Sequence, residues 1–184
     1  AERDGRQIKN MARLISDMVD VSRIQNGRLS IRPGEINLSD LLRRVVIDLA
    51  PQAEFAGSEI LLRTEENVMG FWDEFRIEQI IVNLLTNALR YGNGKPIEVS
   101  LETTTDTAEI NVLDRGIGIA SSEQQRIFEK FERGGNQSVR EGLGMGLYIA
   151  QQLAAVHNGT LEVASTPGEG ATFTLKLPFT PCES

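Results

Sequence analysis

The segment 97–113 constrains the fold most, because apolar and polar residues alternate on both sides of a polar turn. Such alternation is typical of antiparallel strands with one buried face and one face in water. We predict paired strands at 97–101 and 108–113, and further strands at 160–164 and 171–177. Segments with helical spacing stand among them, so helices and strands come in mixed order. The sequence therefore predicts an α+β fold, one sheet with helices packed against one face.

Other elements follow from the same patterns. Helical spacing of apolar residues predicts helices over 39–55, 74–91, 123–131 and 144–157. Short apolar runs predict strands at 59–63 and 68–72, and 133–142 is expected to be a polar, glycine-containing loop. Asn37 is placed to cap the first of these helices, with Asp40 three residues further on.

An amphipathic helix is predicted over residues 2–25. Its apolar residues recur at steps of three and four, at Ile8, Met11, Ile15 and Met18, and the stripe is widened by Leu14, Val19 and Val21. Asn26 and Gly27 then end the helix, since both tolerate the left-handed conformation. The apolar stripe either folds back onto the chain or meets helices of another segment or a second chain, and its three heptads favour the second reading. Because the chain begins Ala-Glu-Arg without Met, we expect it to be part of a longer protein.

Charge and composition limit the partners of the chain. Lys and Arg total 19 against 26 Asp and Glu, which gives a formal net charge of −7. A negative mean field repels phosphate polymers, so we expect no binding to nucleic acid or to an anionic membrane. No apolar run approaches the roughly 20 residues of a membrane span. The chain has one cysteine, Cys182, which excludes an internal disulfide, and one histidine, His157, which argues against a zinc or triad enzyme. A cytoplasmic location is expected for this part, whether or not a parent protein is membrane-anchored.

The predicted helix 74–91 carries side chains suited to a metal and a nucleotide. Asn83 and Asn87 are four residues apart and share one face. Amide oxygens can ligate Mg²⁺, which prefers oxygen ligands and keeps several waters. Arg90 and Tyr91, one turn further on, add a cation for phosphate and a flat face for a base. Taken alone, the Asn pair also fits ordinary amides on a helix surface.

Two glycine-containing segments are candidates for close contact with a ligand. The first, 114–119, follows a strand and reads Asp-Arg-Gly-Ile-Gly-Ile, in which the carboxylate can accept a hydrogen bond from an exocyclic amine. A plain glycine turn is the alternative for this segment. The second, 142–147, reads Gly-Leu-Gly-Met-Gly-Leu and precedes a helix, whose first N–H groups bind anions. It lacks the βαβ context of a dinucleotide fingerprint and the Gly-Lys-Ser/Thr ending of a P-loop.

A basic and aromatic segment lies between the two glycine segments. Phe128 and Phe131 are spaced to anchor the base of a mobile lid, or else to fill the core. Lys130, Arg133 and Arg140 are near enough in sequence to meet phosphates.

The order of these segments is specific. An Asn-bearing helix followed by Asp-x-Gly-x-Gly, Phe-x-x-Phe and Gly-x-Gly-x-Gly resembles the N box, first glycine box, F box and second glycine box of the sensor histidine kinase catalytic domain, a member of the Bergerat-fold ATPases. Residues 165–173 resemble the closing strand turn of that family, and 11–28 resemble the second helix of its dimerisation and phosphoacceptor hairpin. The resemblance covers nearly the whole chain. It implies a two-layer α/β sandwich with a mixed sheet and helices on one face, preceded by a long amphipathic helix.

The resemblance also implies a division of the chain and a function. Residues 1–28 would be part of the dimerisation hairpin, its second helix only, and residues 29–184 the catalytic ATP-binding domain. The implied activity is that of a protein-histidine kinase, which transfers the ATP γ-phosphoryl group to a histidine on the first hairpin helix. That helix is absent from this sequence, so the fragment alone is expected to be inactive in autophosphorylation. The implied partners are ATP with Mg²⁺, the acceptor hairpin, a response regulator and, in the parent, a second copy of the kinase.

Individual roles follow from the same resemblance. Asp114 would take the adenine amino group, Asn87 would ligate Mg²⁺ with support from Asn83, Arg90 would pair with phosphate and Tyr91 would cover the base. Asn83, Asn87 and Arg90 are thus the implied catalytic residues. The other implied nucleotide contacts are Gly116, Gly118, Ile119, Lys130, Arg133, Arg140, Gly142, Leu143, Gly144, Met145, Gly146 and Leu147. His157 is expected to be structural and not a phosphoacceptor.

Asn83 separates branches of the implied superfamily. Gyrase-like and chaperone ATPases, and the serine kinases that inhibit sigma factors, carry Glu at this position to activate water or a hydroxyl, and an amide cannot act as that base. We therefore expect slow intrinsic ATP hydrolysis. Two alternatives stay open: a nucleotide-binding interaction module without transfer, and a hydrolysing ATPase of the gyrase type.

Overall fold

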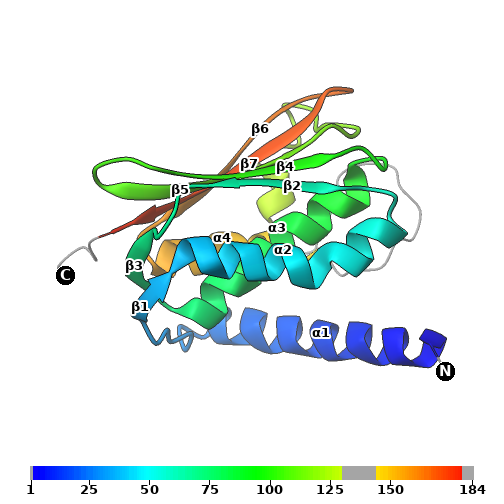
Figure 1. Cartoon of the computed structure of the whole chain (residues 1–184). Coiled ribbons are helices and arrows are strands. Elements are labelled where there is room, and N and C mark those ends of the chain that lie inside the picture. The colour runs from blue at the N-terminus through cyan, green and yellow to red at the C-terminus, as the bar shows by residue number, and fades with distance from the viewer. Residues whose placement is uncertain (1, 130–143, 180–184) are drawn as a thin grey trace.

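The predicted α+β architecture is confirmed by the computed structural model, which describes residues 2–129 and 144–179 of the chain (Figure 1). The first half contains α1 (Glu2–Gln25), β1 (Gly34–Asn37), α2 (Leu38–Phe55), β2 (Ile60–Thr64), β3 (Met69–Trp72) and α3 (Glu74–Tyr91). The second half contains β4 (Ile97–Thr103), β5 (Thr107–Asp114), the 3₁₀ helix η1 (Arg126–Phe128), α4 (Gly146–Val156), β6 (Thr160–Thr166) and β7 (Gly170–Pro178).

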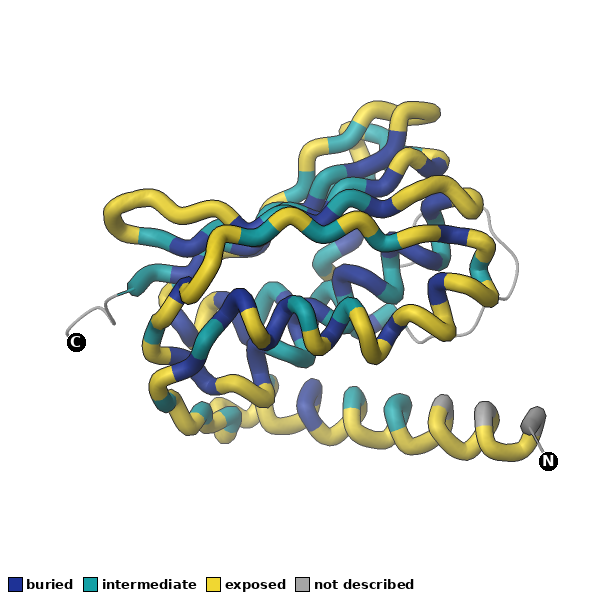
Figure 2. The backbone as a smooth tube through the Cα atoms, viewed as in Figure 1, coloured by how far each residue is buried: buried dark blue, intermediate teal, exposed yellow. Residues whose placement is uncertain are grey.

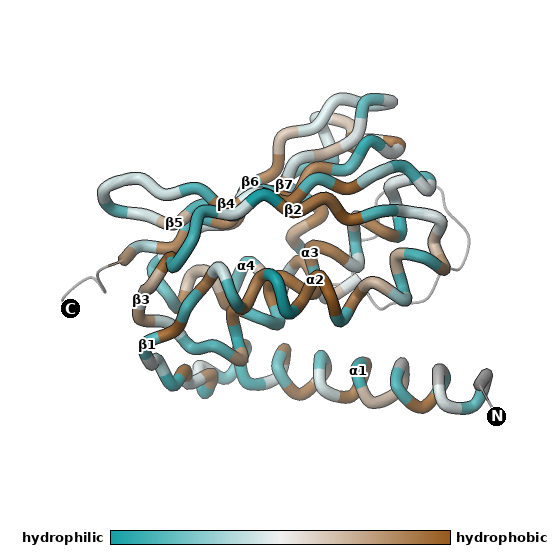
Figure 3. Tube along the Cα trace, in the orientation of Figure 1, coloured by the Kyte–Doolittle hydropathy of each residue, from teal (hydrophilic) through white to brown (hydrophobic). Residues whose placement is uncertain are grey.

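A mixed five-stranded sheet forms one layer of the domain, in the order β2-β4-β5-β7-β6. β2 runs parallel to β4, and the other neighbours are antiparallel. Every second residue of β5 is buried, as alternation predicted, because only one face of the sheet is covered. Helices α2, α3 and α4 cover that face in a second layer (Figure 1). The core lies between the two layers, where hydrophobic positions of the helices and strands meet (Figure 3).

Two details differ from the predictions. The expected single sheet is joined by a second, two-stranded one, in which β1 and β3 pair antiparallel with Gly34 opposite Trp72. These strands have four residues each, too few for a clear alternation. Residues 123–131 were expected to form a helix, but the described part contains only turns and the three-residue η1. The reason is local, since Gln125 provides no side-chain cap and Glu129 is already extended.

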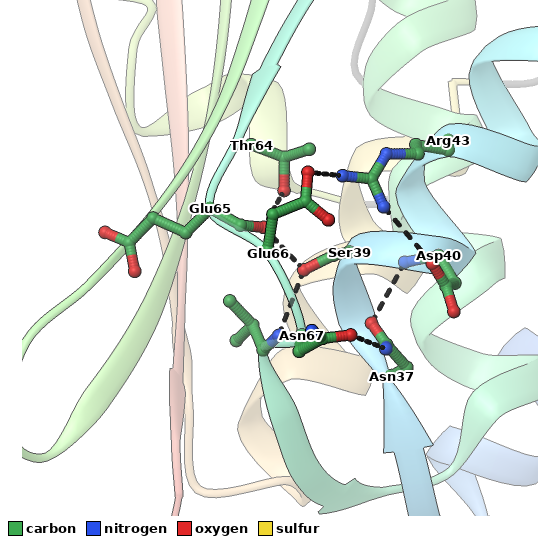
Figure 4. A network of polar contacts seen from close by, with 9 residues as sticks. Asn37, Ser39, Asp40, Arg43, Thr64, Glu65, Glu66 and Asn67 are labelled. Carbon is green, nitrogen blue, oxygen red and sulfur yellow. Dashed lines mark hydrogen bonds and ion pairs between the residues drawn. The ribbon is translucent and has the colours of Figure 1, made fainter.

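The turn between β2 and β3 is tied to the start of α2 (Figure 4). Asn37 caps α2 as predicted, since its side chain accepts the N–H of Asp40 at 3.1 Å. Ser39 is fully buried, and its hydroxyl donates to the carbonyl of Glu65 at 2.7 Å and accepts the N–H of Val68 at 3.0 Å. The Ser39 hydroxyl thus satisfies the buried N–H of Val68, and it shares the Glu65 carbonyl with the Thr64 hydroxyl, which donates to the same oxygen at 2.8 Å.

Helix α1 forms an outer layer beyond α3 and α4 (Figure 1). It ends as predicted, with Gly27 in the left-handed region at φ 63°. The apolar stripe is exposed, with Ile8 67%, Met11 62%, Ile15 60% and Met18 58% accessible. These four residues therefore do not fold back onto the described part of the chain, whereas Val21, predicted at the edge of the stripe, is buried on the side of α1 that packs there. None of the described helices combines the length and the apolar character required to cross a bilayer.

Candidate functional site

Helix α3 forms one wall of the candidate site. Its first turn is capped by Asp73, whose carboxylate accepts the N–H of Arg76 at 3.2 Å. One side of the helix is inserted in the core, with fully buried residues at Ile77, Ile80, Ile81, Leu84 and Leu85. The polar side carries Asn83, Asn87 and Arg90, all partly buried. Of the two asparagines, Asn83 lies where α3 borders α4, and Asn87 is one turn further along the same helix.

Asn83 joins this face to the second glycine segment. Its Nδ2 donates to the carbonyl of Gly146 at 3.1 Å, so the start of α4 is fixed against α3. A Cβ added at Gly146 would lie only 3.6 Å from the Asn83 amide. Within the described residues, by contrast, the Asn87 side chain makes no hydrogen bond and Arg90 makes no ion pair. Both keep their polar groups for other partners.

Asp114 ends β5 and is the buried charged group of the site. It is 3% exposed, and its Oδ1 accepts the N–H of Gly116 at 2.9 Å. Burial raises the pKa of the Asp114 carboxyl above its ordinary 3.8, while hydrogen bonds from the backbone of Gly116 and Ala171 act in the opposite direction. The end of α3 is close by, since a Cβ added at Gly92 would lie 3.7 Å from the Asp114 Cβ. A carboxylate is thus presented where the sheet meets α3.

The glycines of the first glycine segment allow backbone to pack on backbone. A Cβ at Gly116 would clash with the carbonyl oxygen of Tyr91, and one at Gly118, which has φ 69°, would clash with that of Thr166. A Cβ at Gly170 would likewise clash with the carbonyl oxygen of Asp114. The space that we expected to admit a ligand is filled here by protein backbone. Contact of these glycines with nucleotide stays a prediction.

Sequence reasoning missed two side chains that hold the segment after Asp114 in place. Ser165 accepts the N–H of Ile119 at 2.8 Å and donates to the carbonyl of Gly170 at 2.6 Å. Gln124 donates to the carbonyls of Ile119 and Ser165, at 3.1 and 2.9 Å. No local pattern predicts these contacts, because Ile119 and Ser165 are 46 residues apart.

The second glycine segment is described only in part. Gly144 has φ 69°, Met145 is 2% exposed and packs in the core, and Leu147 packs against the core. The first turn of α4 has no side-chain cap from Met145. The remaining site predictions of this region lie outside the described residues, namely Lys130, Phe131, Arg133, Arg140, Gly142 and Leu143.

Phe128 and His157 are packing residues. The Phe128 ring meets Phe173 edge-on at 6.2 Å between centroids, so the described member of the aromatic pair fills the core. His157 is 7% exposed, its Nδ1 contacts the Leu153 carbonyl at 2.7 Å, and its Nε2 accepts the N–H of Asp73 at 3.2 Å. With both ring nitrogens engaged, His157 is structural, as expected.

The described residues contain no group of three His, Cys, Asp or Glu side chains that could hold a metal ion. The amide face of α3 is a donor set of another kind. Asn83 donates through Nδ2 and leaves its Oδ1 as an acceptor, and the Asn87 amide keeps its oxygen. Neutral amide oxygens suit Mg²⁺, which takes the rest of its ligands from phosphates and water.

Comparison with known proteins gives one consistent answer. Residues 72–181 match the family described as Histidine kinase-, DNA gyrase B-, and HSP90-like ATPase. The chain is 32% identical over 169 residues to the sensor histidine kinase MtrB of Mycobacterium tuberculosis, covering 90% of this chain and 30% of MtrB. It is 34% identical over 178 residues to the bacteriophytochrome of Pseudomonas aeruginosa, covering 95% of this chain and 24% of that protein. The chain thus spans less than a third of either relative.

Solved structures agree. Full-length ShkA in complex with AMPPNP superposes with a TM-score of 0.82 at 25% identity, over 100% of this chain and 40% of that chain. The Acinetobacter baumannii histidine kinase AdeS shares the fold, with a TM-score of 0.79 at 21% identity, over 95% of this chain and 81% of that chain. With its buried Asp114 and the Asn face of α3, the chain belongs to the histidine kinase-, DNA gyrase B- and HSP90-like ATPase family, as an ATP-binding catalytic domain of the sensor histidine kinases of two-component systems.

Proposed function

We propose that this domain transfers the γ-phosphoryl group of ATP to a histidine on a helical hairpin outside this sequence. The observation that carries the proposal is the convergence of a buried carboxylate, Asp114, with the end of α3. Asn83, bonded to the start of α4, supports it by bringing the second glycine segment to the same helix. The chain supplies binding and positioning, and the acceptor comes from elsewhere.

Asp114 would select the base. A buried carboxylate accepts a hydrogen bond from the adenine amino group, whereas the carbonyl of guanine would face it with a second acceptor. An unmatched acceptor pair in a buried site is costly, so ATP is favoured over GTP. Tyr91, whose carbonyl contacts the first glycine segment, would cover the base from the end of α3.

Asn87, supported by Asn83, would hold Mg²⁺ through amide oxygens. When bound, the ion neutralises phosphate charge and so assists phosphoryl transfer. Arg90, in the last turn of α3, would pair with phosphate and add positive charge near the transferred group. Asn83 has no basic group to activate water, so we expect hydrolysis without acceptor to be slow.

The two parts of the chain would have separate roles. Residues 1–28 would be the second helix of the dimerisation hairpin and residues 29–184 the catalytic domain. The exposed stripe of α1 supports this division, because Ile8, Met11, Ile15 and Met18 are apolar yet face away from the described part of the chain. The first hairpin helix, a second kinase copy and a response regulator would be the partners of the whole protein.

A labelling experiment tests the transfer. The chain is mixed with a histidine-bearing acceptor hairpin, Mg²⁺ and ATP labelled at the γ position. We expect acid-labile label on the hairpin and none on the chain, and much less label with Asp114→Asn when ATP is limiting. Label on His157 would contradict the proposal, as would rapid phosphate release without any hairpin. ATP binding with no label on the hairpin would favour an interaction module instead.

A further inference from the structure

A buried polar contact joins α1 to α3, and no part of the ATP site uses it. Asp20 is 4% exposed, and its Oδ1 lies 3.1 Å from Nη1 of Arg76, which is itself 8% exposed. Its Oδ2 accepts a hydrogen bond from Nε2 of Gln79 at 2.8 Å. Arg76 also donates to Oε1 of Gln79 at 2.9 Å, so the three side chains form a closed set. We call Asp20, Arg76 and Gln79 the polar lock.

The polar lock is important because α1 has little else to hold it. Val21 is its one apolar residue in the buried core, at 6% exposure, among the side chains that the structure describes. Figure 2 shows α1 exposed along most of its length, with its buried positions on the side that faces the other helices. Helix α3, in contrast, has residues such as Ile80 and Leu84 wholly inside the core. If the contact opens, α1 is therefore the element that moves.

We propose that the polar lock holds α1 in one docked orientation on the catalytic domain and that its opening releases α1 as a unit. Breaking a buried ion pair by removing one partner leaves a charge without compensation, which is among the larger single costs in a protein. With few apolar contacts to offset that cost, docking of α1 depends on neither Asp20 nor Arg76 being left as an unpaired buried charge.

The docked orientation of α1 limits where a phosphoacceptor can lie, and this step of the inference rests on the proposed function. Asp20 and Val21 face the domain, whereas Met11 and Ile15 of the stripe lie roughly on the opposite side of α1, as the period of about 3.6 residues per turn requires. A helix packed on the stripe is then separated from the domain by the width of α1, about 10 Å. An acceptor on such a helix reaches the ATP of the same chain only after the lock opens.

Hydrogen exchange tests the polar lock without using kinase activity. In Asp20→Leu, which leaves Arg76 unpaired, we expect backbone amides of α1 to exchange roughly a hundredfold faster. Exchange in α3 and α4, and nucleotide affinity, should stay as in the unchanged chain. Asp20→Asn, a milder change that keeps the shape of the side chain, should show the same pattern more weakly. If the unchanged chain failed to bind ATP, the proposed function would be wrong, but the hydrogen-exchange comparison would still test the polar lock.

Two further variants make the test specific. Asp4→Asn removes an exposed negative charge from the same helix and should leave exchange unchanged. The double variant Asp20→Leu with Arg76→Met leaves no buried charge unpaired and should recover most of the protection of α1. Unchanged exchange of α1 in Asp20→Leu would overturn the proposal. Faster exchange spread evenly over α1, α3 and α4 would overturn it too, because the contact would then support the whole fold.

Discussion

Burial disfavours the charged form of the Asp114 carboxyl. It is 3% exposed, and burial raises its pKa although two backbone N–H groups stabilise the ionised form. In the absence of ligand, the ionised carboxyl therefore lowers the stability of the fold at neutral pH. A base that donates a hydrogen bond to the carboxylate would recover part of this cost.

The raised pKa of Asp114 predicts how nucleotide affinity and stability change with pH. As pH falls through that pKa, the carboxylate takes a proton, so affinity should fall at a higher pH than for an ordinary Asp of pKa 3.8. As pH falls over the same range, the unfolding free energy of the ligand-free domain should rise, because the folded state binds the Asp114 proton more tightly than the unfolded state does. Titration of a fluorescent ATP analogue and urea unfolding, each over a pH series, check the two opposite trends.

Asp114→Asn serves as the control for that series. The nucleotide affinity of this variant at neutral pH should be lower by about 1.5–3 kcal/mol, on the order of ten- to a hundredfold. Its affinity should also no longer change with pH through protonation of residue 114. Unchanged affinity in this variant would remove Asp114 from the site.

Ser39→Ala tests a residue outside the site. The substitution leaves the buried Val68 N–H without the hydroxyl that accepts it, whereas the Glu65 carbonyl keeps its hydrogen bond from the Thr64 hydroxyl. We expect the unfolding free energy to fall by about 1–3 kcal/mol, measured by urea denaturation. Ser30→Ala, at an exposed position, should change it by less than about 0.5 kcal/mol. Equal effects of the two changes would contradict the assigned role of the buried hydroxyl.

The sequence predicted the roles of residues that are marked by their immediate neighbours in the chain. Asn37 precedes a helix and Asp114 ends a strand, and both are where those patterns put them. Ser39 and Ser165 could not be predicted, because the groups that they bond are brought close only by the fold. Contact of Met145 with nucleotide stays a prediction; its side chain is in the core, and a Met between Gly144 and Gly146 gives no sequence signal of burial.

At the scale of elements, α3 and α4 behave as one unit. Asn83 on α3 bonds the first residue of α4, and His157 after α4 bonds the N–H of Asp73 before α3. The periodicity of the sequence predicted both helices, but it could not show that they are tied at two points. Nor did it show the pairing of β1 with β3, since strands of four residues contain little pattern.

Gly116→Ala tests how the elements meet at the site. The added methyl would clash with the Tyr91 carbonyl, so the 114–119 segment has to move away from α3. We expect a loss of about 1–3 kcal/mol in unfolding free energy together with weaker nucleotide binding. Gly34→Ala is the matched control, because nothing lies within 4 Å of the added atom. Thermal unfolding and nucleotide titration check both, and a Gly116→Ala domain as stable as the Gly34→Ala domain would contradict the close packing.

At the scale of the whole molecule, α1 stands apart from the two-layer domain. The sequence predicted its apolar stripe and its end at Gln25. The ion pair between Asp20 and Arg76 could not be predicted, because the two residues are 56 positions apart and each occurs in an ordinary amphipathic helix. Long-range charge pairing of this kind has no local pattern.

The exposed stripe of α1 predicts a separation of effects. Ile15 and Met18 are 60% and 58% exposed, so a double change of both to Lys should leave nucleotide affinity and the thermal stability of the domain nearly unchanged. The same change should weaken binding of an acceptor hairpin by at least tenfold, since two charges would enter an apolar interface. Hairpin binding followed by fluorescence anisotropy is the check, and full binding by the double variant would remove the stripe from that interface.

In the proposed function, Asp114 and the Asn face of α3 bind ATP and Mg²⁺ together. A crystal structure of the chain with a non-hydrolysable ATP analogue and Mg²⁺ tests it most directly. We expect the adenine amino group within hydrogen-bond distance of the Asp114 carboxylate and the ion on the amide oxygen of Asn87. A base bound away from Asp114, or an ion held without either asparagine, would contradict it.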